Sequence, residues 1–175
     1  MDSVLADIST KWYGLANKEY GCNVTIDDVT DWDTSKFFPC GKSIFKYLSQ
    51  PGFFRDLSTI SGAVEGIQAI HDAGHEVFVV TASTAQGATD KMHWMKENFP
   101  SIPHENIIIT HTKHLVCGDV FIDDSPHNIK AYREYWPRAF IVGVNYPYNR
   151  ESGRYANRMV DTWDEITKAV LTMEW

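Results

Sequence analysis

The sequence has few cysteines, an excess of acidic over basic residues and no long apolar run. Cys22, Cys40 and Cys117 form no Cys-x-x-Cys pair and leave one cysteine over, so we expect no disulfide framework and favour a reducing cytoplasm. A net charge of −7 argues against binding to nucleic-acid polymers or anionic membranes. No run approaches the roughly 20 apolar residues of a membrane helix, and the start lacks a signal-peptide pattern.

The 175 residues, 43% of them apolar, predict one domain in which helices alternate with strands. Apolar runs predict strands at 76–80, 107–109, 120–122 and 139–142. Helical spacing predicts helices at 4–20, 61–73, 89–99 and 163–173, and another that starts near Ser125. Residues 22–58 are less regular and predict a small, mostly helical insertion with a helix at 42–48. This alternation predicts an α/β fold with a parallel sheet.

Polar side chains follow three of the predicted strands. Thr81 ends one strand, Lys113 comes shortly after the next, and Asp123 and Asp124 follow the third. The carboxyl ends of parallel strands form the usual ligand site of such a sheet. Two adjacent carboxylates repel unless one is protonated or a cation is bound, and oxygen ligands favour Mg²⁺. The alternative is that the pair only caps the helix that begins at Ser125 and Pro126.

Four segments resemble one family. They are Met-Asp-Ser-Val-Leu-Ala-Asp at 1–7, Pro-Gly-Phe-Phe-Arg-Asp-Leu at 51–57, Val-Phe-Val-Val-Thr at 77–81, and Thr-His-Thr-Lys at 110–113 continuing to Gly-Asp-Val-Phe-Ile-Asp-Asp at 118–124. The chain thereby resembles the 5′(3′)-deoxyribonucleotidases of the haloacid dehalogenase (HAD) superfamily. The resemblance implies a HAD-like, Rossmann-type parallel sheet flanked by helices, with the core at about 1–10 and 59–175 and a helical cap at about 11–58.

The resemblance also implies a role for each matching residue. Asp2 would be the general acid and base and would offer its backbone carbonyl to Mg²⁺, while Asp124, supported by Asp123, would be the carboxylate ligand. Thr81 would bind a phosphoryl oxygen and Lys113 would neutralise charge on the phosphate, because two anions meet only when cations screen them. Lys91 would add a second ammonium, although a solvated helix lysine is an equally common role.

Other residues carry open alternatives. The insertion contains five aromatic residues: Trp32, Phe37, Phe38, Phe45 and Tyr47. Their side chains could form the core of the insertion or face a nucleotide base. We expect Phe37 and Phe38 to contact the substrate. His111, His114 and Cys117 have zinc-like spacing but no evident fourth ligand, so we favour ordinary loop and core roles. The acidic residues at 27–28 and at 31 and 33 are expected to form a solvated face.

The opening segment matches the tail of the pattern Asp-x-Asp-Gly/Ser-Val-Leu-Ala-Asp, whose first aspartate attacks phosphorus in this family. That aspartate would stand directly before Met1, and the central strand of the sheet would precede it. We therefore expect Met1 to be an internal methionine of a longer protein, or the chain to be an inactive remnant, and we favour the first. The neighbouring strands would otherwise keep unpaired backbone groups.

The favoured function is a Mg²⁺-dependent phosphomonoesterase acting on (deoxy)nucleoside monophosphates through an aspartyl-phosphate. The partner is then a small-molecule nucleotide, and a homodimer stays open. The alternatives are a phosphatase of sugar phosphates and a catalytically silent nucleotide binder. A receiver-type phosphoacceptor domain is disfavoured because its aspartate pair comes first in the chain, whereas here Thr81 and Lys113 precede Asp123.

Overall fold

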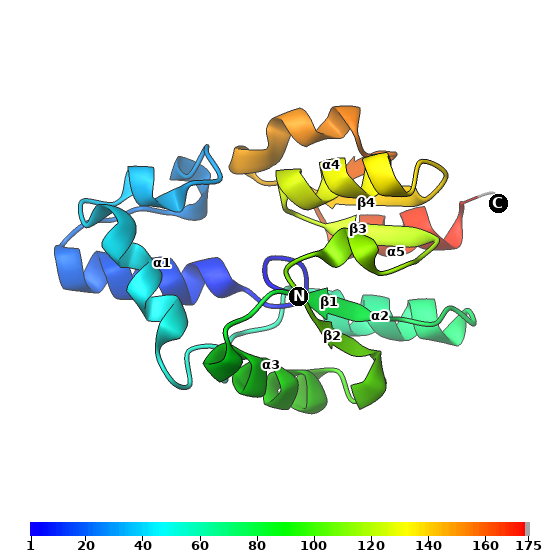
Figure 1. The fold of residues 1–175 in the computed structure, drawn as a ribbon, viewed down its shortest axis with the longest axis horizontal. Coiled ribbons are helices and arrows are strands. Elements are labelled where there is room, and N and C mark those ends of the chain that lie inside the picture. The colour runs from blue at the N-terminus through cyan, green and yellow to red at the C-terminus, as the bar shows by residue number, and fades with distance from the viewer. Residues whose placement is uncertain (174–175) are drawn as a thin grey trace.

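The computed structural model describes residues 1–173 and has the predicted α/β architecture, with helices flanking parallel strands (Figure 1). The α-helices are α1 (Ile8–Tyr20), α2 (Ala63–Asp72), α3 (Ala85–Asn98), α4 (Pro126–Tyr135) and α5 (Trp163–Leu171). The strands are β1 (Val79–Thr81), β2 (Ile107–Ile109), β3 (Val120–Asp123), β4 (Phe140–Val144) and β5 (Arg158–Val160). The 3₁₀ helices are η1 (Ile26–Asp28), η2 (Thr34–Phe37), η3 (Gly41–Ser49), η4 (His104–Asn106), η5 (Lys113–Leu115) and η6 (Pro147–Arg154). No helix of the described residues is both long and apolar enough to cross a bilayer.

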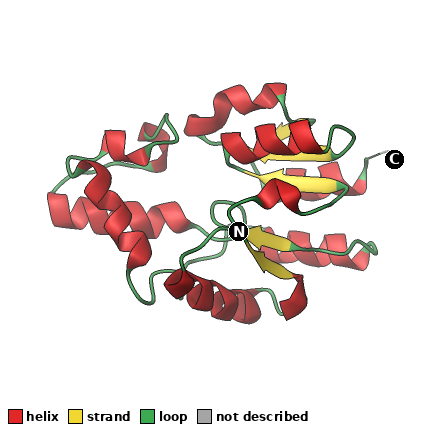
Figure 2. Cartoon of the chain, in the orientation of Figure 1, coloured by secondary structure: helices red, strands yellow, loops and turns green. Residues whose placement is uncertain are grey.

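The strands form two parallel sheets, in agreement with the predicted parallel α/β fold. In the first, β1 pairs with β2 so that Val79 lies opposite Ile107. In the second, the order is β3-β4-β5, with Val120 opposite Phe140. Within residues 1–173, β1 and β3 each pair along one edge only. Figure 2 shows the arrowheads of both sheets on the same side of the molecule, so the carboxyl ends of β1 and β3 lie near each other.

Several element boundaries differ from those predicted, and capping explains two of them. The helix predicted from residue 4 begins at Ile8, because the Asp7 side chain accepts a hydrogen bond from the Thr10 N–H at 3.0 Å. The helix predicted from residue 89 begins at Ala85, since the Thr84 hydroxyl accepts from the Gly87 N–H at 3.1 Å. The first strand starts later than predicted, at Val79, and β5 was not predicted at all.

The segment between α1 and α2 is helical, as predicted, although its helices are of the 3₁₀ type. Figure 1 shows α1 and these short helices, in blue and cyan, gathered beside the strands. The indole N–H of Trp12 on α1 donates to the Ile44 carbonyl at 2.8 Å and ties η3 to the helix. The acidic residues expected to be solvated make local contacts, since the Asp28 carboxylate accepts a hydrogen bond from the Thr25 N–H at 2.8 Å and Asp31 pairs with Lys36 at 2.6 Å.

The contact between α2 and α5 depends on a glycine. Gly66 on α2 faces the buried ring of Trp163, the first residue of α5. The indole N–H of Trp163 donates to the Val4 carbonyl at 2.7 Å. A Cβ atom at Gly66 would lie 2.4 Å from Trp163 Cε3 and 2.8 Å from the Thr167 hydroxyl. The indole cannot easily move aside, because its hydrogen bond to the Val4 carbonyl fixes it. The close packing of α2 on α5 therefore requires glycine.

We expect Gly66→Ala to lower the free energy of unfolding by about 1–3 kcal/mol, the usual cost of overpacking. Gly14→Ala is the matched control, since Gly14 is an exposed α1 residue where an added Cβ atom would have no neighbour within 4 Å. Alanine there should raise stability by about 0.5–1 kcal/mol. Urea denaturation of both variants checks the pair, and equal effects in the two would contradict the close packing of α2 on α5.

Candidate active site

The ends of β1 and β3 bring charged and polar side chains to one edge of the two sheets. Thr81 is the last residue of β1, and Asp123 is the last residue of β3. Asp124 follows and leads into α4, whose N-cap is Ser125. All three site residues are buried, with Thr81 1% exposed, Asp123 4% and Asp124 7%. Buried polar groups rarely lack hydrogen-bond partners. The hydrogen bonds and ion pairs of these side chains therefore determine their charge and reactivity.

Lys91 on α3 is a buried ammonium rather than a solvated helix lysine. Its side chain is 1% exposed, and its Nζ donates to Thr81 Oγ1 at 3.1 Å and to the Ala82 carbonyl at 2.8 Å. The same Nζ forms an ion pair with the Asp2 carboxylate and lies 4.4 Å from the centre of the Phe54 ring. Asp2, Thr81 and Lys91 are thus linked in one hydrogen-bonded set, while the second Asp2 oxygen, Oδ1, is buried without a protein partner among residues 1–173.

The turn at the start of the chain positions Asp2. The Met1 carbonyl accepts hydrogen bonds from the N–H groups of Leu5 at 2.7 Å and Ala6 at 3.1 Å. Ser3 has a φ of 57°, a left-handed conformation that a non-glycine residue adopts only where its surroundings hold it. The Tyr146 hydroxyl donates to the Ser3 carbonyl at 2.9 Å and fixes this turn from η6. The Asp2 side chain is therefore held toward Lys91 by contacts from distant parts of the chain.

The negative charge of Asp123 is stabilised by four neighbouring groups. Its carboxylate accepts from Lys113 Nζ at 3.0 Å, from the Ser125 N–H at 2.9 Å, from the Asn128 amide at 3.0 Å and from the Tyr132 hydroxyl at 3.2 Å. Burial alone would raise the pKa of Asp123, but Lys113 and the hydrogen bonds outweigh it, so the pKa is lowered. Burial likewise opposes the charge of Lys113, yet Asp123 raises its pKa above the usual value. Both groups are charged at neutral pH.

Of the two adjacent carboxylates, Asp124 is the one whose negative charge has no cationic partner among residues 1–173. Its only side-chain hydrogen bond within residues 1–173 comes from the Tyr148 hydroxyl at 2.6 Å. Burial, and then the adjacent charge of Asp123, raise the pKa of Asp124 to about 6. Asn149 holds the backbone in place, since its amide donates to the Asp124 carbonyl at 2.6 Å. A buried carboxylate next to a second negative charge is a position that a bound cation would stabilise.

The sequence of residues 1–174 matches the family described as 5′ nucleotidase, deoxy (pyrimidine), cytosolic type C protein. The chain belongs to this nucleotidase family. A 5′(3′)-deoxyribonucleotidase of Bacillus subtilis is 28% identical over 173 residues, which cover 98% of this chain and 95% of the relative. A 5′(3′)-deoxyribonucleotidase of Clostridium acetobutylicum is 31% identical over 135 residues, covering 76% and 74% of the two chains. These matches confirm the predicted resemblance and the enzyme class, a phosphoric monoester hydrolase of the HAD-like superfamily.

A solved structure confirms the fold class. A hydrolase from Pseudomonas syringae superposes with a TM-score of 0.58 at 15% sequence identity, covering 99% of this chain and 97% of that one. At this identity the likeness concerns the fold alone. The cytoplasmic location and the homodimer stay predictions.

The HAD-like family implies a metal cofactor, and the nucleotidase site fits a hard cation in part. Asp124 supplies a carboxylate with one protein hydrogen bond, and in residues 1–173 no hydrogen bond reaches the Asp2 backbone carbonyl. Oxygen donors of this kind suit Mg²⁺. The described residues hold no cluster of three acidic, histidine or cysteine side chains, so a cation here would keep water or substrate oxygens as further ligands.

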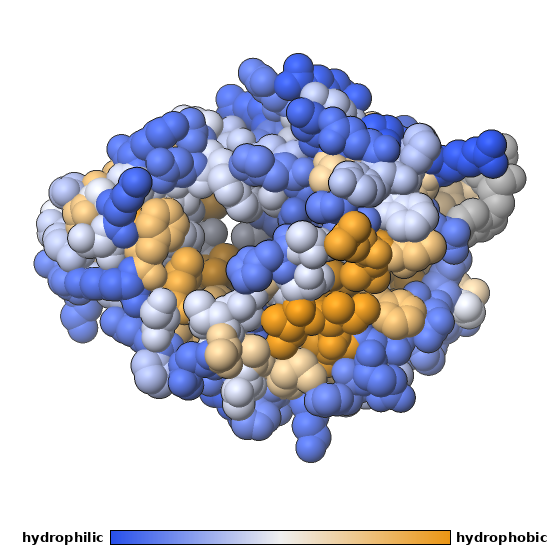
Figure 3. Space-filling model, viewed as in Figure 1, coloured by the Kyte–Doolittle hydropathy of each residue, from blue (hydrophilic) through white to orange (hydrophobic). Residues whose placement is uncertain are grey.

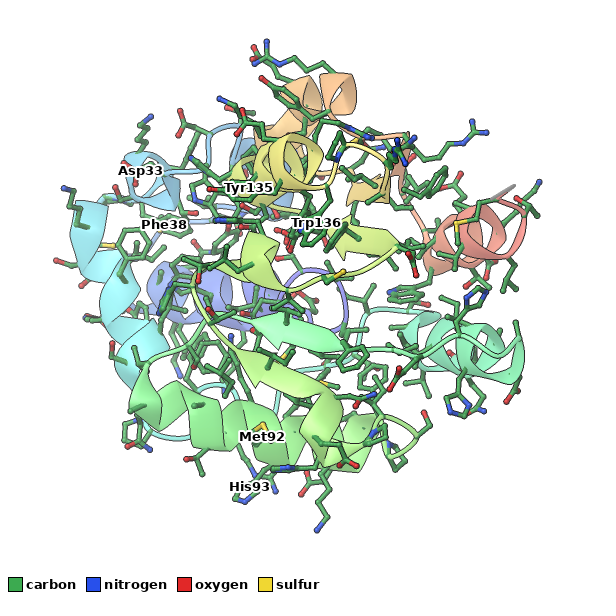
Figure 4. All side chains as sticks on the ribbon, turned by 45° about the vertical axis from the view of Figure 1, so that its right-hand side comes forward. Asp33, Phe38, Met92, His93, Tyr135 and Trp136 are labelled. Carbon is green, nitrogen blue, oxygen red and sulfur yellow. The ribbon has the colours of Figure 1, made fainter. Side chains whose placement is uncertain are left out.

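Of the residues with zinc-like spacing, His114 has other contacts. The His114 ring packs 4.3 Å from the ring of Tyr135, and its backbone carbonyl accepts from the Trp136 indole at 2.8 Å. Figure 4 shows Tyr135 and Trp136 together at the end of α4, beside β3. Cys117 is exposed. These contacts give His114 the packing role that the sequence favoured.

Two groups of site residues escaped the sequence analysis. Asn128 and Tyr132 both reach Asp123 from α4, and their spacing of four residues, one helical turn, is a signal that could have placed them on the face above Asp123. Tyr148 and Asn149 reach Asp124 from η6, which lies beyond the next strand. The sequence near these two residues contains no pattern that points to Asp124.

The aromatic side chains between α1 and α2 divide into buried and exposed ones. Phe38 (labelled in Figure 4) is 5% exposed, and its ring lies 5.2 Å from that of Tyr13 on α1. Phe37 is partly buried in the same core. Trp32 is 46% exposed, and its ring stands edge-on to those of Tyr148, at 5.5 Å, and His127, at 5.7 Å. Trp32 thus links the segment between α1 and α2 to Tyr148, which donates a hydrogen bond to Asp124.

Proposed function

We propose that the chain is a Mg²⁺-dependent phosphomonoesterase of (deoxy)nucleoside monophosphates that works through an aspartyl-phosphate. The carrying observation is that Asp2, Thr81 and Lys91 share one hydrogen-bonded set while Lys113 and the aspartate pair meet at the neighbouring strand end. The buried ammonium of Lys91, the partly buried ammonium of Lys113 and the uncompensated carboxylate of Asp124 suit a phosphate dianion together with a divalent cation. The names of the relatives support a deoxyribonucleotide as substrate.

Each residue has a proposed task in this reaction. Lys91, Lys113 and the Thr81 hydroxyl bind the phosphate oxygens and orient the phosphorus. Asp2 donates a proton to the departing nucleoside oxygen and then takes one from the water that hydrolyses the aspartyl-phosphate. Asp124, with Asp123 beside it and the Asp2 carbonyl, would hold Mg²⁺, which supplies charge neutralisation at the phosphate. The position that the family resemblance gives to the attacking aspartate falls before Met1.

We also propose that residues 11–58 act as a cap that closes over the substrate. Figure 3 shows an opening between these residues and the strand-bearing part of the molecule. Trp32 borders this side of the site, since it contacts Tyr148, which reaches Asp124. Among the cap aromatics, its half-exposed ring is the best placed to stack on a base, whereas Phe38 is occupied by Tyr13. A contact of Phe37 or Phe38 with the base stays a prediction.

Phosphate release with and without Mg²⁺ tests the proposed reaction. We expect release that requires Mg²⁺ and is faster from deoxynucleoside monophosphates than from sugar phosphates. Faster release from sugar phosphates would instead support the second candidate, a sugar phosphatase. Nucleotide binding without any release would support the third candidate, a catalytically silent binder.

Trp32→Ala is expected to weaken binding of nucleotides by about tenfold and to leave that of sugar phosphates nearly unchanged. The reason is that stacking of a base on an aromatic ring contributes about 1–3 kcal/mol, and a sugar phosphate has no base. Calorimetric titration with both ligands measures the difference. Phe45→Ala is the matched control, since Phe45 is a cap aromatic of similar exposure, 40%, whose ring contacts Trp12. Equal losses for both ligands in Trp32→Ala would contradict stacking.

A further inference from the structure

Two stacked tyrosines stand at the turn that leads from β4 into η6. The ring centroids of Tyr146 and Tyr148 are 5.2 Å apart and the ring planes differ by 7°, so the two rings form a parallel stack. Both side chains are partly buried and pack against the hydrophobic core. Such aromatic pairs are stabilised beyond the area that they bury. Each ring therefore restricts the movement of the other, and the positions of the two hydroxyl groups depend on each other.

The hydroxyl of Tyr148 orients the first proposed metal ligand, the Asp124 carboxylate. It donates to Asp124 Oδ2 at 2.6 Å. Burial, and then the charge of Asp124, raise the pKa of Tyr148, so its hydroxyl is protonated and is the donor of this bond. Within residues 1–173 no hydrogen bond reaches the other oxygen of Asp124, Oδ1. The carboxylate thus keeps one oxygen for a cation, in an orientation that Tyr148 sets.

The hydroxyl of Tyr146 orients the second proposed ligand, the Asp2 carbonyl, through the neighbouring peptide group. It donates to the Ser3 carbonyl at 2.9 Å. The Asp2 and Ser3 carbonyls belong to the peptide groups on either side of the Ser3 Cα atom, and their relative orientation depends on the Ser3 φ of 57°. A residue other than glycine adopts this φ only where its surroundings hold it, at a cost of about 1–3 kcal/mol. The hydrogen bond from Tyr146 is such a contact, so it helps to fix the direction of the Asp2 carbonyl.

Asn149 connects the turn that carries the tyrosines to the backbone of Asp124. Asn149 is 2% exposed, and its amide donates to the Asp124 carbonyl at 2.6 Å and to the Val144 carbonyl at 2.7 Å. Its side-chain oxygen accepts from the Tyr146 N–H at 3.0 Å. Both N–H groups and the oxygen of this amide are thus paired, as buried polar groups usually are. The tyrosine turn therefore has a fixed position relative to Asp124.

We propose that Tyr146 and Tyr148 are positioning residues that fix the Asp124 carboxylate and the Asp2 carbonyl relative to each other and thereby make the site select Mg²⁺ over Ca²⁺. This role rests on the metal site of the proposed function. Mg²⁺ requires ligand distances of about 2.0–2.1 Å in octahedral geometry, whereas Ca²⁺ accepts about 2.3–2.6 Å in a more flexible geometry. A rigid pair of ligands suits the smaller ion. Once the pair is loosened, the ligands can adopt the longer distances of Ca²⁺, so Mg²⁺ loses more affinity than Ca²⁺ does.

Titration of the metal-free protein with MgCl₂ and with CaCl₂, followed by the melting temperature and without any substrate, tests the proposal. Tyr148→Phe removes one hydroxyl and keeps the ring for the stack. We expect its Mg²⁺ affinity to fall about tenfold, since loss of a group that orients a metal ligand typically costs about 10–100-fold in affinity. Its Ca²⁺ affinity should fall by less than about threefold, because Ca²⁺ tolerates a looser site. Tyr146→Phe should likewise lose more Mg²⁺ affinity than Ca²⁺ affinity.

Tyr135→Phe is the matched control, since Tyr135 is 58% exposed and its ring packs on that of His114, away from the aspartates. This variant should keep both metal affinities. The double variant Tyr146→Phe with Tyr148→Phe should lose less Mg²⁺ affinity than the two single losses combined, because both hydroxyls act on one pair of ligands.

The ratio of the two metal affinities separates a positioning role from a general loss of structure. Equal losses of Mg²⁺ and Ca²⁺ affinity in the single variants would overturn the proposal, as would unchanged affinities. Fully additive losses in the double variant would show that the two tyrosines act separately, which would overturn it as well. If the unchanged protein bound no Mg²⁺, the metal site of the proposed function would be wrong, and the role of the tyrosines with it.

Discussion

Asp124→Asn is expected to abolish the stabilisation of the protein by Mg²⁺. A ligand at one hundred times its dissociation constant stabilises the folded state by about 2.7 kcal/mol, which for a protein of this size raises the melting temperature by roughly 5–10 °C. Asparagine keeps an oxygen that can accept the hydrogen bond from Tyr148 but removes the charge. Thermal unfolding with and without Mg²⁺ should therefore show a shift in the unchanged protein and almost none in the variant.

Without metal, the same substitution should raise the free energy of unfolding. Because burial and Asp123 raise the pKa of Asp124 to about 6, the folded protein favours the protonated form. The contribution of Asp124 to stability is thus present below the unfolded pKa of about 4 and is lost as the pH rises through about 6. Above pH 6 the metal-free variant should be more stable than the unchanged protein by on the order of 2 kcal/mol.

Asp27→Asn is the control for both effects, because Asp27 is an exposed acidic residue of the cap region. It should respond to Mg²⁺ as the unchanged protein does. If Asp124→Asn retained the full Mg²⁺ shift, Asp124 would not be a metal ligand. If the metal-free variant were less stable above pH 6, the carboxylate would be compensated by a contact other than that of Tyr148.

Lys91→Met is expected to lower the free energy of unfolding by about 2–4 kcal/mol, because it removes one partner of a buried ion pair. Methionine fills a similar volume but leaves the Asp2 carboxylate, the Thr81 hydroxyl and the Ala82 carbonyl without their shared donor. The melting temperature should fall by roughly 5–15 °C. Nucleotide binding should weaken as well, since the proposed phosphate site loses one of its two ammonium groups.

Lys96→Met on the same helix is the control, since Lys96 is exposed and the change should alter stability by less than about 0.5 kcal/mol. Combining Lys91→Met with Asp2→Asn should restore part of the lost stability, because the orphaned charge is then gone. Additive losses in this double variant would show that the ion pair contributes nothing. An effect of Lys91→Met as small as that of Lys96→Met would contradict its burial.

The carboxyl ends of the strands could be predicted because a local sequence pattern marks them. Short apolar runs followed by Thr81 or by Asp123 and Asp124 identify parallel strands, and the carboxyl ends of such strands share one edge. The helical nature of residues 22–58 was predictable from the same kind of reasoning. Local pattern and the general geometry of α/β sheets were sufficient for these features.

Other features depend on contacts between distant segments. Nothing in the sequence near Lys91 distinguishes it from a solvated lysine, since its burial depends on Asp2, 89 positions away, and on Phe54. The hydrogen bonds that Asp123 accepts from Tyr132 and that Asp124 accepts from Tyr148 likewise come from different elements, α4 and η6. The partition of the strands into two sheets likewise depends on pairing between segments and not on any single strand.

Calorimetric titration of a non-hydrolysable deoxynucleoside monophosphate analogue, with and without Mg²⁺, tests the central claim most directly. A phosphonate analogue avoids heat from turnover. The proposed site, with Lys91, Lys113 and the aspartate pair around one phosphate, predicts binding that is at least about tenfold tighter with Mg²⁺ and that loses this enhancement in Asp124→Asn. Equal affinity with and without Mg²⁺, or no nucleotide binding at all, would contradict a metal-dependent nucleotide phosphate site at the strand ends.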